Sequence, residues 1–321
     1  MTKTKPQIGH LLGTQGLAEN DVRTILDLAK SIKKAGTHTS TESSGEQWLR
    51  GKTVANLFFE DSTRTRNSFE LASRKLGASV LNFGASSSSL SKGETLIDTV
   101  RTIAAMKPHC LVVRHSCAGS PHFLASQLNL PVVNAGDGFH EHPTQGLLDV
   151  LTMEEHLGTV RGKHVLIMGD IAHSRVARSN IYLLRTLGAT VSICGPPTLM
   201  PPSPQALGVE FSFRPETLLP KADVVMTLRI QFERQNSAQI PSISEYQRFW
   251  GLNQERARLL KPSAIIMHPG PMNRGVELDA EVADGPRSVI LDQVSNGVVI
   301  RMAVLGLVVA PEEAMAWKKT R

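Results

Sequence analysis

Hydroxyl and guanidinium side chains follow the apolar stretch Thr53–Phe59, in the segment SerThrArgThrArg at 62–66. We expect a buried strand to end near Phe59 and a helix to begin among the polar residues. The N–H groups and the dipole of a helix N-terminus attract an anion, and Arg64 adds a permanent charge. The GxxxxGK[ST] pattern is absent, so the segment favours a small phosphate-bearing ligand over a nucleotide. A Ser/Thr helix cap with two solvated arginines is an equally good interpretation of these residues alone.

Three further arginines stand singly beside apolar runs. Arg114 follows such a run, Arg175 lies at a predicted helix start, and Arg229 follows a predicted strand. Ligands of open parallel sheets bind beyond the carboxyl ends of the strands. Arg114 could therefore reach the same anion as Arg64, whereas Arg175 and Arg229 suit the carboxylates of an acceptor. Each arginine alone also fits a solvated surface residue. The glycines of GxGxxG are missing before Arg175, which argues against a nicotinamide site.

His142 precedes Pro143, which suits the first position of a helix, so His142 is predicted to be the N-cap. The helix dipole disfavours a cationic imidazole there, and a neutral imidazole can donate a hydrogen bond to a substrate carbonyl. Gln145, about one turn on, adds an amide. A metal site on His140, Glu141 and His142 is disfavoured, because neither HExxH spacing nor a Cys/His partner set is present. A capping histidine is the simpler alternative.

The segment HisProGlyPro at 268–271 ends a predicted strand. Its two prolines lack N–H donors and fix the backbone φ angle. The carbonyl groups of Pro269 and Gly270 could then face an amide or amine nitrogen of a ligand. A rigid turn without a binding role is the alternative interpretation.

The elements that must position these residues alternate between β-branched runs and helix-like segments. This pattern predicts α/β domains, each with a central, mostly parallel sheet flanked by helices. Strands are predicted at Thr53–Phe59, Ser79–Phe83, Leu111–Arg114, Val132–Asn134, His164–Met168, Thr190–Cys194, Asp223–Thr227 and Ala264–His268. Helices are predicted at Val22–Ala35, Asn67–Leu76, Thr95–Met106, Thr144–Leu157 and Arg175–Leu187.

Four stretches bear on the organisation of the chain. A domain boundary is predicted near Gly158–Gly162, because a fresh strand follows. The polar stretch Gly84–Gly93 is, taken alone, typical of a linker, and Gly195–Pro204 predicts a surface turn. The segment Gly297–Val309 fits either a strand or a buried helix.

Composition limits the function classes. The 321 residues carry a formal net charge of +6, and only 5% are aromatic. Because the basic residues are scattered, with Lys318, Lys319 and Arg321 expected to form a solvated tail, nucleic-acid binding is not indicated. The apolar stretch Val298–Val309 contains Arg301 and is too short to span a bilayer. We therefore expect no membrane role.

Cys110, Cys117 and Cys194 form neither a CxxC pair nor an even framework. We expect them to be small apolar packing residues in a reducing, cytoplasmic compartment.

Seven strings, in order along nearly the whole chain, resemble the aspartate/ornithine transcarbamoylase family, and within it the aspartate-specific branch. They are SerThrArgThrArg at 62–66, SerLysGlyGluThr at 91–95, ArgHis at 114–115, HisProThrGln at 142–145, HisSerArg at 173–175, LeuArgIleGlnPheGluArg at 228–234 and HisProGlyPro at 268–271. The resemblance implies transfer of a carbamoyl group from carbamoyl phosphate to L-aspartate, giving N-carbamoyl-L-aspartate and phosphate, in de novo pyrimidine (UMP) biosynthesis.

The resemblance also implies site residues, with no metal and no cofactor. Those for carbamoyl phosphate are Ser62, Thr63, Arg64, Thr65, Arg114, His142, Gln145, Pro269, Gly270 and Pro271, of which Arg64, Thr65, Arg114 and His142 take part in catalysis. Those for L-aspartate are Lys92, Arg175, Arg229 and Gln231. Two departures from the family pattern are Gly270, where leucine is usual, and Ser91, where a lysine is frequent beside Lys92.

The implied architecture has a carbamoyl-phosphate-binding domain at 1–158, onto which 297–321 packs back, and an aspartate-binding domain at 159–296. The implied assembly is a homotrimer with shared active sites, in which Lys92 reaches a neighbouring subunit, or a larger assembly with regulatory or dihydroorotase-like chains. Two rivals stay open. An ornithine-type enzyme would usually carry HisCysLeuPro and SerMetGly strings, which this chain lacks, and a non-catalytic protein could keep the fold.

Overall fold

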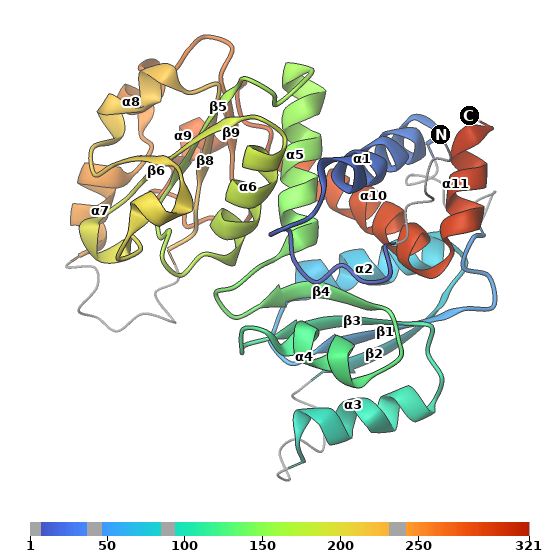
Figure 1. Cartoon of the computed structure of the whole chain (residues 1–321). Helices are drawn as coiled ribbons and strands as arrows, with labels where there is room; N and C mark the ends of the chain where they lie inside the picture. Colours follow the sequence, from blue (N-terminus) through green and yellow to red (C-terminus); the bar gives the residue numbers. More distant parts are fainter. Residues whose placement is uncertain (1–7, 37–46, 85–93, 231–241, 321) are drawn as a thin grey trace. The chain divides into compact units, whose positions relative to one another are not determined.

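The computed structural model describes residues 8–36, 47–84, 94–230 and 242–320. It has two compact units, 1–147 with 296–321 and 148–295, so the divisions fall inside two helices (Figure 1). The helices are α1 Glu19–Lys34, α2 Thr63–Lys75, α3 Leu96–Ala105, α4 Ser120–Gln127, α5 Pro143–Leu157, α6 Arg175–Thr186, α7 Ile243–Trp250, α8 Gln254–Arg258, α9 Ala280–Ala283, α10 Ile290–Val309 and α11 Pro311–Lys319. The strands are β1 Thr53–Phe58, β2 Ser79–Gly84, β3 Cys110–His115, β4 Val132–Asp137, β5 His164–Met168, β6 Thr190–Cys194, β7 Glu210–Ser212, β8 Val224–Thr227 and β9 Ile265–Met267.

Within its described residues, the first unit contains a four-stranded parallel sheet in the order β2-β1-β3-β4. Alternate residues of β1 and β3, such as Leu57 and Val113, pack with Val100 of α3 and Leu124 of α4 on one face. The helices α1, α2 and α11 lie on the other side of the sheet (Figure 1). The chain leaves β1 toward β2 and then returns to β3 on the opposite side of β1, so the strand order reverses between β1 and β3.

The described part of the second unit contains a five-stranded parallel sheet in the order β7-β6-β5-β8-β9. Leu166 of β5, Val225 of β8 and Ile266 of β9 pack with the buried residues of α8 and α9. Here the strand order reverses between β5 and β8. The chain therefore forms two α/β units with parallel sheets flanked by helices, as predicted.

Every predicted strand and helix is present, with ends shifted by a few residues. The apolar face predicted for 67–76 is confirmed, because Phe69, Ala72 and Leu76 are buried. Strand β7 was not predicted, since it is short and none of its residues is fully buried. The ambiguous segment at 297–309 is the C-terminal part of α10.

Lys318 and Lys319 belong to a helix and not to an irregular tail, although Lys319 is exposed to solvent as expected. α11 begins with Pro311, has Glu312 and Glu313 in its first turn, and ends with the two lysines, an arrangement that its dipole favours. Lys318 also reaches Asp27 of α1 at 3.3 Å.

Helix α10 is longer than the apolar stretch considered in the sequence. Its 20 residues are enough in length and composition to cross a membrane, whereas the stretch 298–309 considered in the sequence is too short by itself. However, 72% of its most apolar window is buried inside the protein. Arg301 is buried as well, with its guanidinium over the Phe69 ring and Nη1 donating to Ser68 Oγ at 2.8 Å. Such burial is typical of a core helix.

The cysteines differ in exposure. Cys110 and Cys194 are buried, as expected of packing residues, and burial raises the pKa of each thiol to about 12. Cys117 is exposed, which contradicts its assignment as a packing residue.

Candidate active site

The turn between β1 and α2 presents a helix N-terminus at the carboxyl edge of the first sheet. Ser62 is the N-cap of α2, but its side chain makes no capping hydrogen bond, which contradicts the cap interpretation for this residue. The first turn of α2, which the structure describes in full, contains no acidic residue. Thr65 is buried, whereas Thr63 and Arg64 are exposed. No carboxylate of this turn therefore competes with an anionic ligand for the positive helix end.

Arg114 lies beside this turn because β1 and β3 are neighbours, with Phe58 opposite Arg114. The guanidinium is not a surface group, since the residue is only 8% exposed. Its Nη2 donates to Glu60 Oε1 at 3.2 Å, and its Nη1 donates to the Ala135 carbonyl at 3.3 Å. Arg114 and the Ser62–Thr65 turn thus flank the point where the strand order reverses, which is where open α/β sheets bind ligands.

His142 directly precedes α5 and is buried. Its carbonyl accepts hydrogen bonds from Gln145 N at 2.9 Å and Gly146 N at 3.2 Å, as expected of a helix N-cap. Gln145 is half-buried in the first turn of the same helix. The imidazole and the amide are therefore carried by one helix N-terminus.

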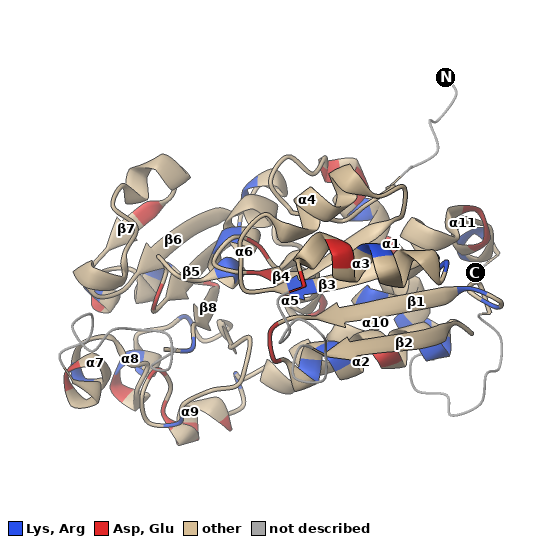
Figure 2. Ribbon diagram, turned by 90° about the horizontal axis from the view of Figure 1, so that it is seen from below, with Lys and Arg blue, Asp and Glu red and all other residues tan. Residues whose placement is uncertain are grey.

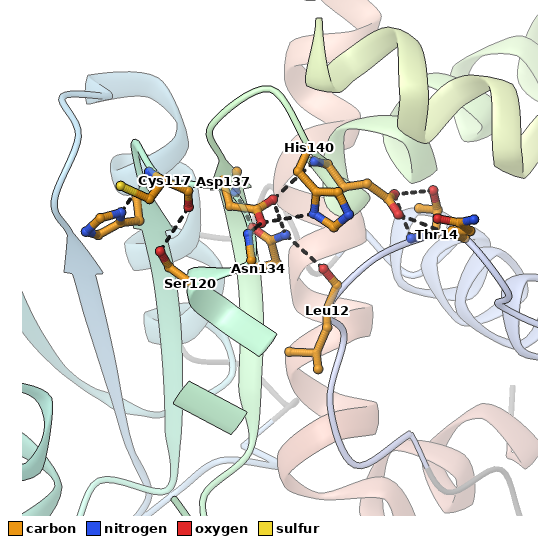
Figure 3. Close-up of polar contacts among 12 residues, drawn as sticks. Leu12, Thr14, Cys117, Ser120, Asn134, Asp137 and His140 are labelled. Atoms are coloured by element: carbon orange, nitrogen blue, oxygen red, sulfur yellow. Dashed lines mark hydrogen bonds and ion pairs between the residues drawn. The ribbon is translucent and has the colours of Figure 1, made fainter. Parts of the chain in front are cut away.

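Two buried carboxylates hold the backbone that leads into His142 (Figure 3). Asp137 Oδ1 accepts from Asn134 Nδ2 at 2.8 Å and from Glu141 N at 3.1 Å. The Glu141 carboxylate accepts from the Thr14 N–H at 2.7 Å, from the Thr14 hydroxyl and from the Gln15 N–H at 3.1 Å. The Glu141 carboxylate therefore holds the segment at Thr14 and Gln15 in place.

His115, at the end of β3, is neutral near pH 7. Burial lowers the pKa of its imidazole, and the negative charge of Asp137 opposes this shift only in part. Its Nδ1 accepts a hydrogen bond from Cys117 N at 2.8 Å, so this nitrogen carries no proton.

In the second unit, α6 begins at Arg175, which is 8% exposed. Ser174 is its N-cap, and the Ser174 hydroxyl accepts from Ala177 N at 3.1 Å. The Asp170 carboxylate accepts from both the backbone N–H and Nδ1 of His173, which orders the turn between β5 and α6. Arg175 is therefore a buried guanidinium on a rigid turn.

Arg229 lies two residues after the end of β8 and is half-buried. β5 and β8 are neighbours, and Leu228 N donates to the Met168 carbonyl at 2.7 Å. Arg175 and Arg229 thus lie in the segments that follow β5 and β8, beyond the carboxyl ends of the two strands between which the strand order reverses. Lys92, with the serine-rich loop, and Gln231 lie outside the described residues.

The turn at 268–271 is held by a buried network within the second unit. Gly270 N donates to His268 Nδ1 at 2.8 Å, so the proton of this imidazole is on Nε2, which donates to Glu277 Oε1 at 3.1 Å. Both side chains are fully buried. His268 N donates to Gln293 Oε1 at 2.9 Å, and Gln293 Nε2 donates to Asp149 at 2.8 Å. The turn is therefore rigid, as the sequence predicts.

Gly270 has a backbone φ of +62°, in the left-handed region that favours glycine, and the following bond to Pro271 is cis. Glycine adopts this left-handed conformation without strain, which suits its presence at position 270, where the family pattern has leucine.

Sequence patterns did not indicate a role for several acids that order the site, namely Glu60, Asp137, Asp170 and Glu277. Their signal is weak. Each lies within a few positions of a predicted motif, but a buried acid is recognisable only once its partner is known.

Lysines and arginines are distributed over many elements of both units, rather than gathered on one segment (Figure 2). This distribution agrees with the expectation that the chain binds small anions and not a polyanion.

Comparison with known proteins is consistent with this arrangement. The family model described as "Aspartate/ornithine carbamoyltransferase, carbamoyl-P binding domain" matches residues 9–155, and that of the "Asp/Orn binding domain" matches residues 161–308. The aspartate carbamoyltransferase catalytic subunit of Syntrophotalea carbinolica is 52% identical over 304 residues, covering 95% of this chain and 96% of that protein.

Two solved structures extend the comparison. Aspartate transcarbamoylase from Trypanosoma cruzi, in complex with N-(phosphonacetyl)-L-aspartic acid, is 32% identical with a TM-score of 0.85, covering 96% of this chain and 98% of that one. Ornithine carbamoyltransferase from Pyrococcus furiosus is 29% identical with a TM-score of 0.83, covering 95% of this chain and 98% of that one. Together with the two domain matches, these similarities place the chain in the aspartate/ornithine carbamoyltransferase family.

Proposed function

We propose that this chain is an aspartate carbamoyltransferase, which transfers the carbamoyl group of carbamoyl phosphate to the amino group of L-aspartate. The products are N-carbamoyl-L-aspartate and phosphate, and the reaction serves de novo pyrimidine biosynthesis. One observation carries the proposal: anion-binding groups gather where the strand order of each sheet reverses. The first sheet has an N-terminus of α2 with Arg114, and the second has Arg175 and Arg229. Such a set suits a phosphate-bearing donor and a dicarboxylate acceptor.

The residue roles are part of the proposal. Ser62, Thr63, Arg64, Thr65 and Arg114 bind the phosphate and carbamoyl groups, His142 and Gln145 bind the carbamoyl group, and the carbonyls of Pro269 and Gly270 accept from its nitrogen, with Pro271 shaping the turn. Arg175, Arg229, Gln231 and Lys92 bind the two carboxylates of aspartate. The burial of Arg114 and Arg175 supports these roles, because a buried guanidinium forms stronger bonds to an anion than an exposed one.

The chemistry follows from these roles. The neutral amine of aspartate attacks the carbamoyl carbon, a C–N bond forms, and the carbonyl oxygen becomes an oxyanion. Thr65, Arg114 and His142 donate hydrogen bonds to this oxygen, with Arg64 balancing the phosphate charge. The bond from carbon to the phosphate oxygen then breaks, and the leaving phosphate takes the amine proton. Orientation of two bound reactants can lower the barrier by about 7–11 kcal/mol.

A comparison of acceptors tests the reaction. The purified chain is given carbamoyl phosphate with L-aspartate, with L-ornithine or with no amine, and phosphate release is measured together with the mass of the product. We expect phosphate release that depends on aspartate and the mass of N-carbamoyl-aspartate. Equal phosphate release with every acceptor would reject specific transfer to aspartate, and no release at all would favour a non-catalytic protein.

Ornithine transfer is the second candidate, since the solved P. furiosus enzyme has the same fold at 29% identity. The charges of the second unit disfavour it, because Arg175 and Arg229 would face a cationic acceptor. Faster turnover with L-ornithine than with L-aspartate would establish this alternative.

We further infer domain limits of 1–158 with 297–321 and of 159–296, a cytoplasmic location and a homotrimer with shared active sites. Larger assemblies with regulatory or dihydroorotase-like chains are compatible with this inference.

Light scattering gives the mass of the assembly. Mixing Lys92→Ala with His142→Ala chains tests the sharing of sites: recovered activity supports sites built from two subunits, and none after subunit exchange contradicts it.

A further inference from the structure

Two histidines and an aspartate of the first unit converge at the end of β4. Asp137 is the last residue of β4, His140 lies three residues on, and His122 lies on α4. The ligand atoms of all three lie within 4.8 Å of one another. The His122 and His140 rings meet edge to face, with centroids 5.5 Å apart. Two imidazoles and one carboxylate form a set that divalent transition metals prefer.

The carboxylate of this cluster is buried and already oriented. Asp137 is fully buried, and its Oδ1 accepts from Asn134 and from the backbone of Glu141 (Figure 3). Its Oδ2 accepts from Gly119 N at 2.7 Å. Outer hydrogen bonds of this kind fix the direction of a ligating carboxylate and are a regular part of metal sites.

The contact between His140 and Asp137 has the spacing of two metal ligands. His140 Nδ1 lies 3.0 Å from Asp137 Oδ2. Because the carboxylate can only accept, Nδ1 holds the shared proton. In a tetrahedral zinc site with bonds of about 2.0–2.1 Å, neighbouring ligand atoms lie about 3.3 Å apart. A metal ion could therefore take the place of this proton with a small movement of the two groups.

His122 completes the cluster from the solvent side. It is exposed, whereas His140 is partly buried, so the third ligand can turn toward the ion without disturbing the core. Three protein ligands leave a coordination position for water or another small ligand. Among the described residues, these three are the group of His, Cys, Asp and Glu side chains close enough to share an ion.

We propose that His122, Asp137 and His140 bind one divalent transition-metal ion, Zn²⁺ by preference. On binding, the metal bonds to His140 Nδ1, to Asp137 Oδ2 and to His122. The Nδ1 proton passes to solvent and the imidazole keeps a single proton on Nε2, so that it binds the metal as a neutral ligand. The site goes beyond the proposed transferase activity and departs from the sequence-based expectation that the chain has no metal.

Zinc titration of the purified, metal-stripped full chain against a chromophoric chelator tests the site. We expect one Zn²⁺ per chain in the wild type and at least a tenfold loss of affinity in His122→Ala and in His140→Ala. His156→Ala is the control, because His156 also contacts a carboxylate, that of Asp292 at 2.9 Å, but lies outside the cluster. Cys117→Ser tests the nearby exposed thiol.

The outcomes separate clearly. Loss of binding in the two cluster variants, with unchanged binding in His156→Ala and Cys117→Ser, supports the site. Equal binding in all variants, loss through Cys117→Ser alone or no saturable binding in the wild type overturns it. Circular dichroism of each variant verifies folding. Co²⁺ gives an independent readout, since the visible bands of a low-symmetry site should be present in the wild type and reduced in His140→Ala.

One consequence rests on the proposed function. His140 lies two residues before His142, so a bound ion would stiffen the loop that carries the imidazole assigned to the carbamoyl group. Turnover should then change with Zn²⁺ in the wild type and not in His122→Ala. An unchanged turnover would remove this coupling, while the titration alone decides whether the site exists.

Discussion

The carboxyl edges of the two sheets share one plan but present different groups to an anion. In each sheet the order reverses once, between β1 and β3 in the first unit and between β5 and β8 in the second. Beside the first reversal, α2 starts without a side-chain cap on its N–H groups. Beside the second, α6 starts with the Ser174 hydroxyl bound to Ala177 N. The N-cap side chain thus uses a backbone donor at the start of α6, whereas the N-cap side chain of α2 uses none.

This difference indicates how each edge would recognise its ligand. A phosphate has several oxygens and suits the N–H groups at the N-terminus of a helix, and the Arg114 guanidinium adds side-chain donors to the same anion. A carboxylate suits the forked donors of a single guanidinium, and the second unit offers Arg175 and Arg229. The same fold can therefore hold a phosphate mainly by backbone and a dicarboxylate mainly by side chains.

The largest expected effect concerns the first unit. His142→Ala should lower kcat by about 10²–10³, because it removes a donor to the oxyanion, while the affinity for carbamoyl phosphate changes little. Steady-state kinetics and a direct binding measurement give the two quantities. Turnover equal to the wild type would take His142 out of the catalytic set.

A variant of the second unit should change acceptor binding instead. Arg229→Ala should raise the KM for L-aspartate by about 10- to 150-fold, since a hydrogen bond to a charged group contributes about 1.5–3 kcal/mol. Arg178→Ala is the control, because Arg178 lies on α6 about one turn after Arg175 and is only half-buried. If both variants kept the wild-type KM, the assignment of Arg229 to aspartate would fail.

The caps of α2 and α6 give a direct test of the comparison. Ser174→Ala should lower the free energy of unfolding by about 1 kcal/mol, because it removes a capping hydrogen bond. Ser62→Ala should lower it by much less, since Ser62 makes no such bond. Urea unfolding at equal protein concentration measures both. An equal decrease in the free energy of unfolding in both variants would contradict the difference in side-chain capping between α2 and α6.

The smallest effect concerns the thiols. Burial raises the pKa of Cys194 to about 12, so almost no thiolate is present near pH 8 and labelling increases only as the pH approaches that value. Iodoacetamide should therefore label the exposed Cys117 and leave Cys110 and Cys194 unlabelled, as read by peptide mass spectrometry. Labelling of Cys194 in the folded chain would show that its unit opens more readily than its burial suggests.

Local patterns predicted much of this molecule. Apolar runs located the strands, and the helix starts predicted at Pro143 and Arg175 are confirmed. Patterns failed where burial depends on distant segments. Ser62 is the N-cap of α2, but the alternative of a capping side chain does not hold for it, and Lys318 of the helical C-terminal segment contacts Asp27 of α1. Cys117 is exposed although its residue type is usually buried.

The amino-acid sequence by itself determined which groups could bind anions and on which side of each strand they stand, because both depend on residues only a few positions apart. Only the tertiary structure decided which of these groups meet. Arg114 meets Glu60 across 54 residues of sequence, and Asp137 meets His122 and His140 at one point. Such pairings depend on strand order and on which acids become buried. Hydrophobic periodicity does not specify either, because the same alternation of strands and helices allows many sheet orders.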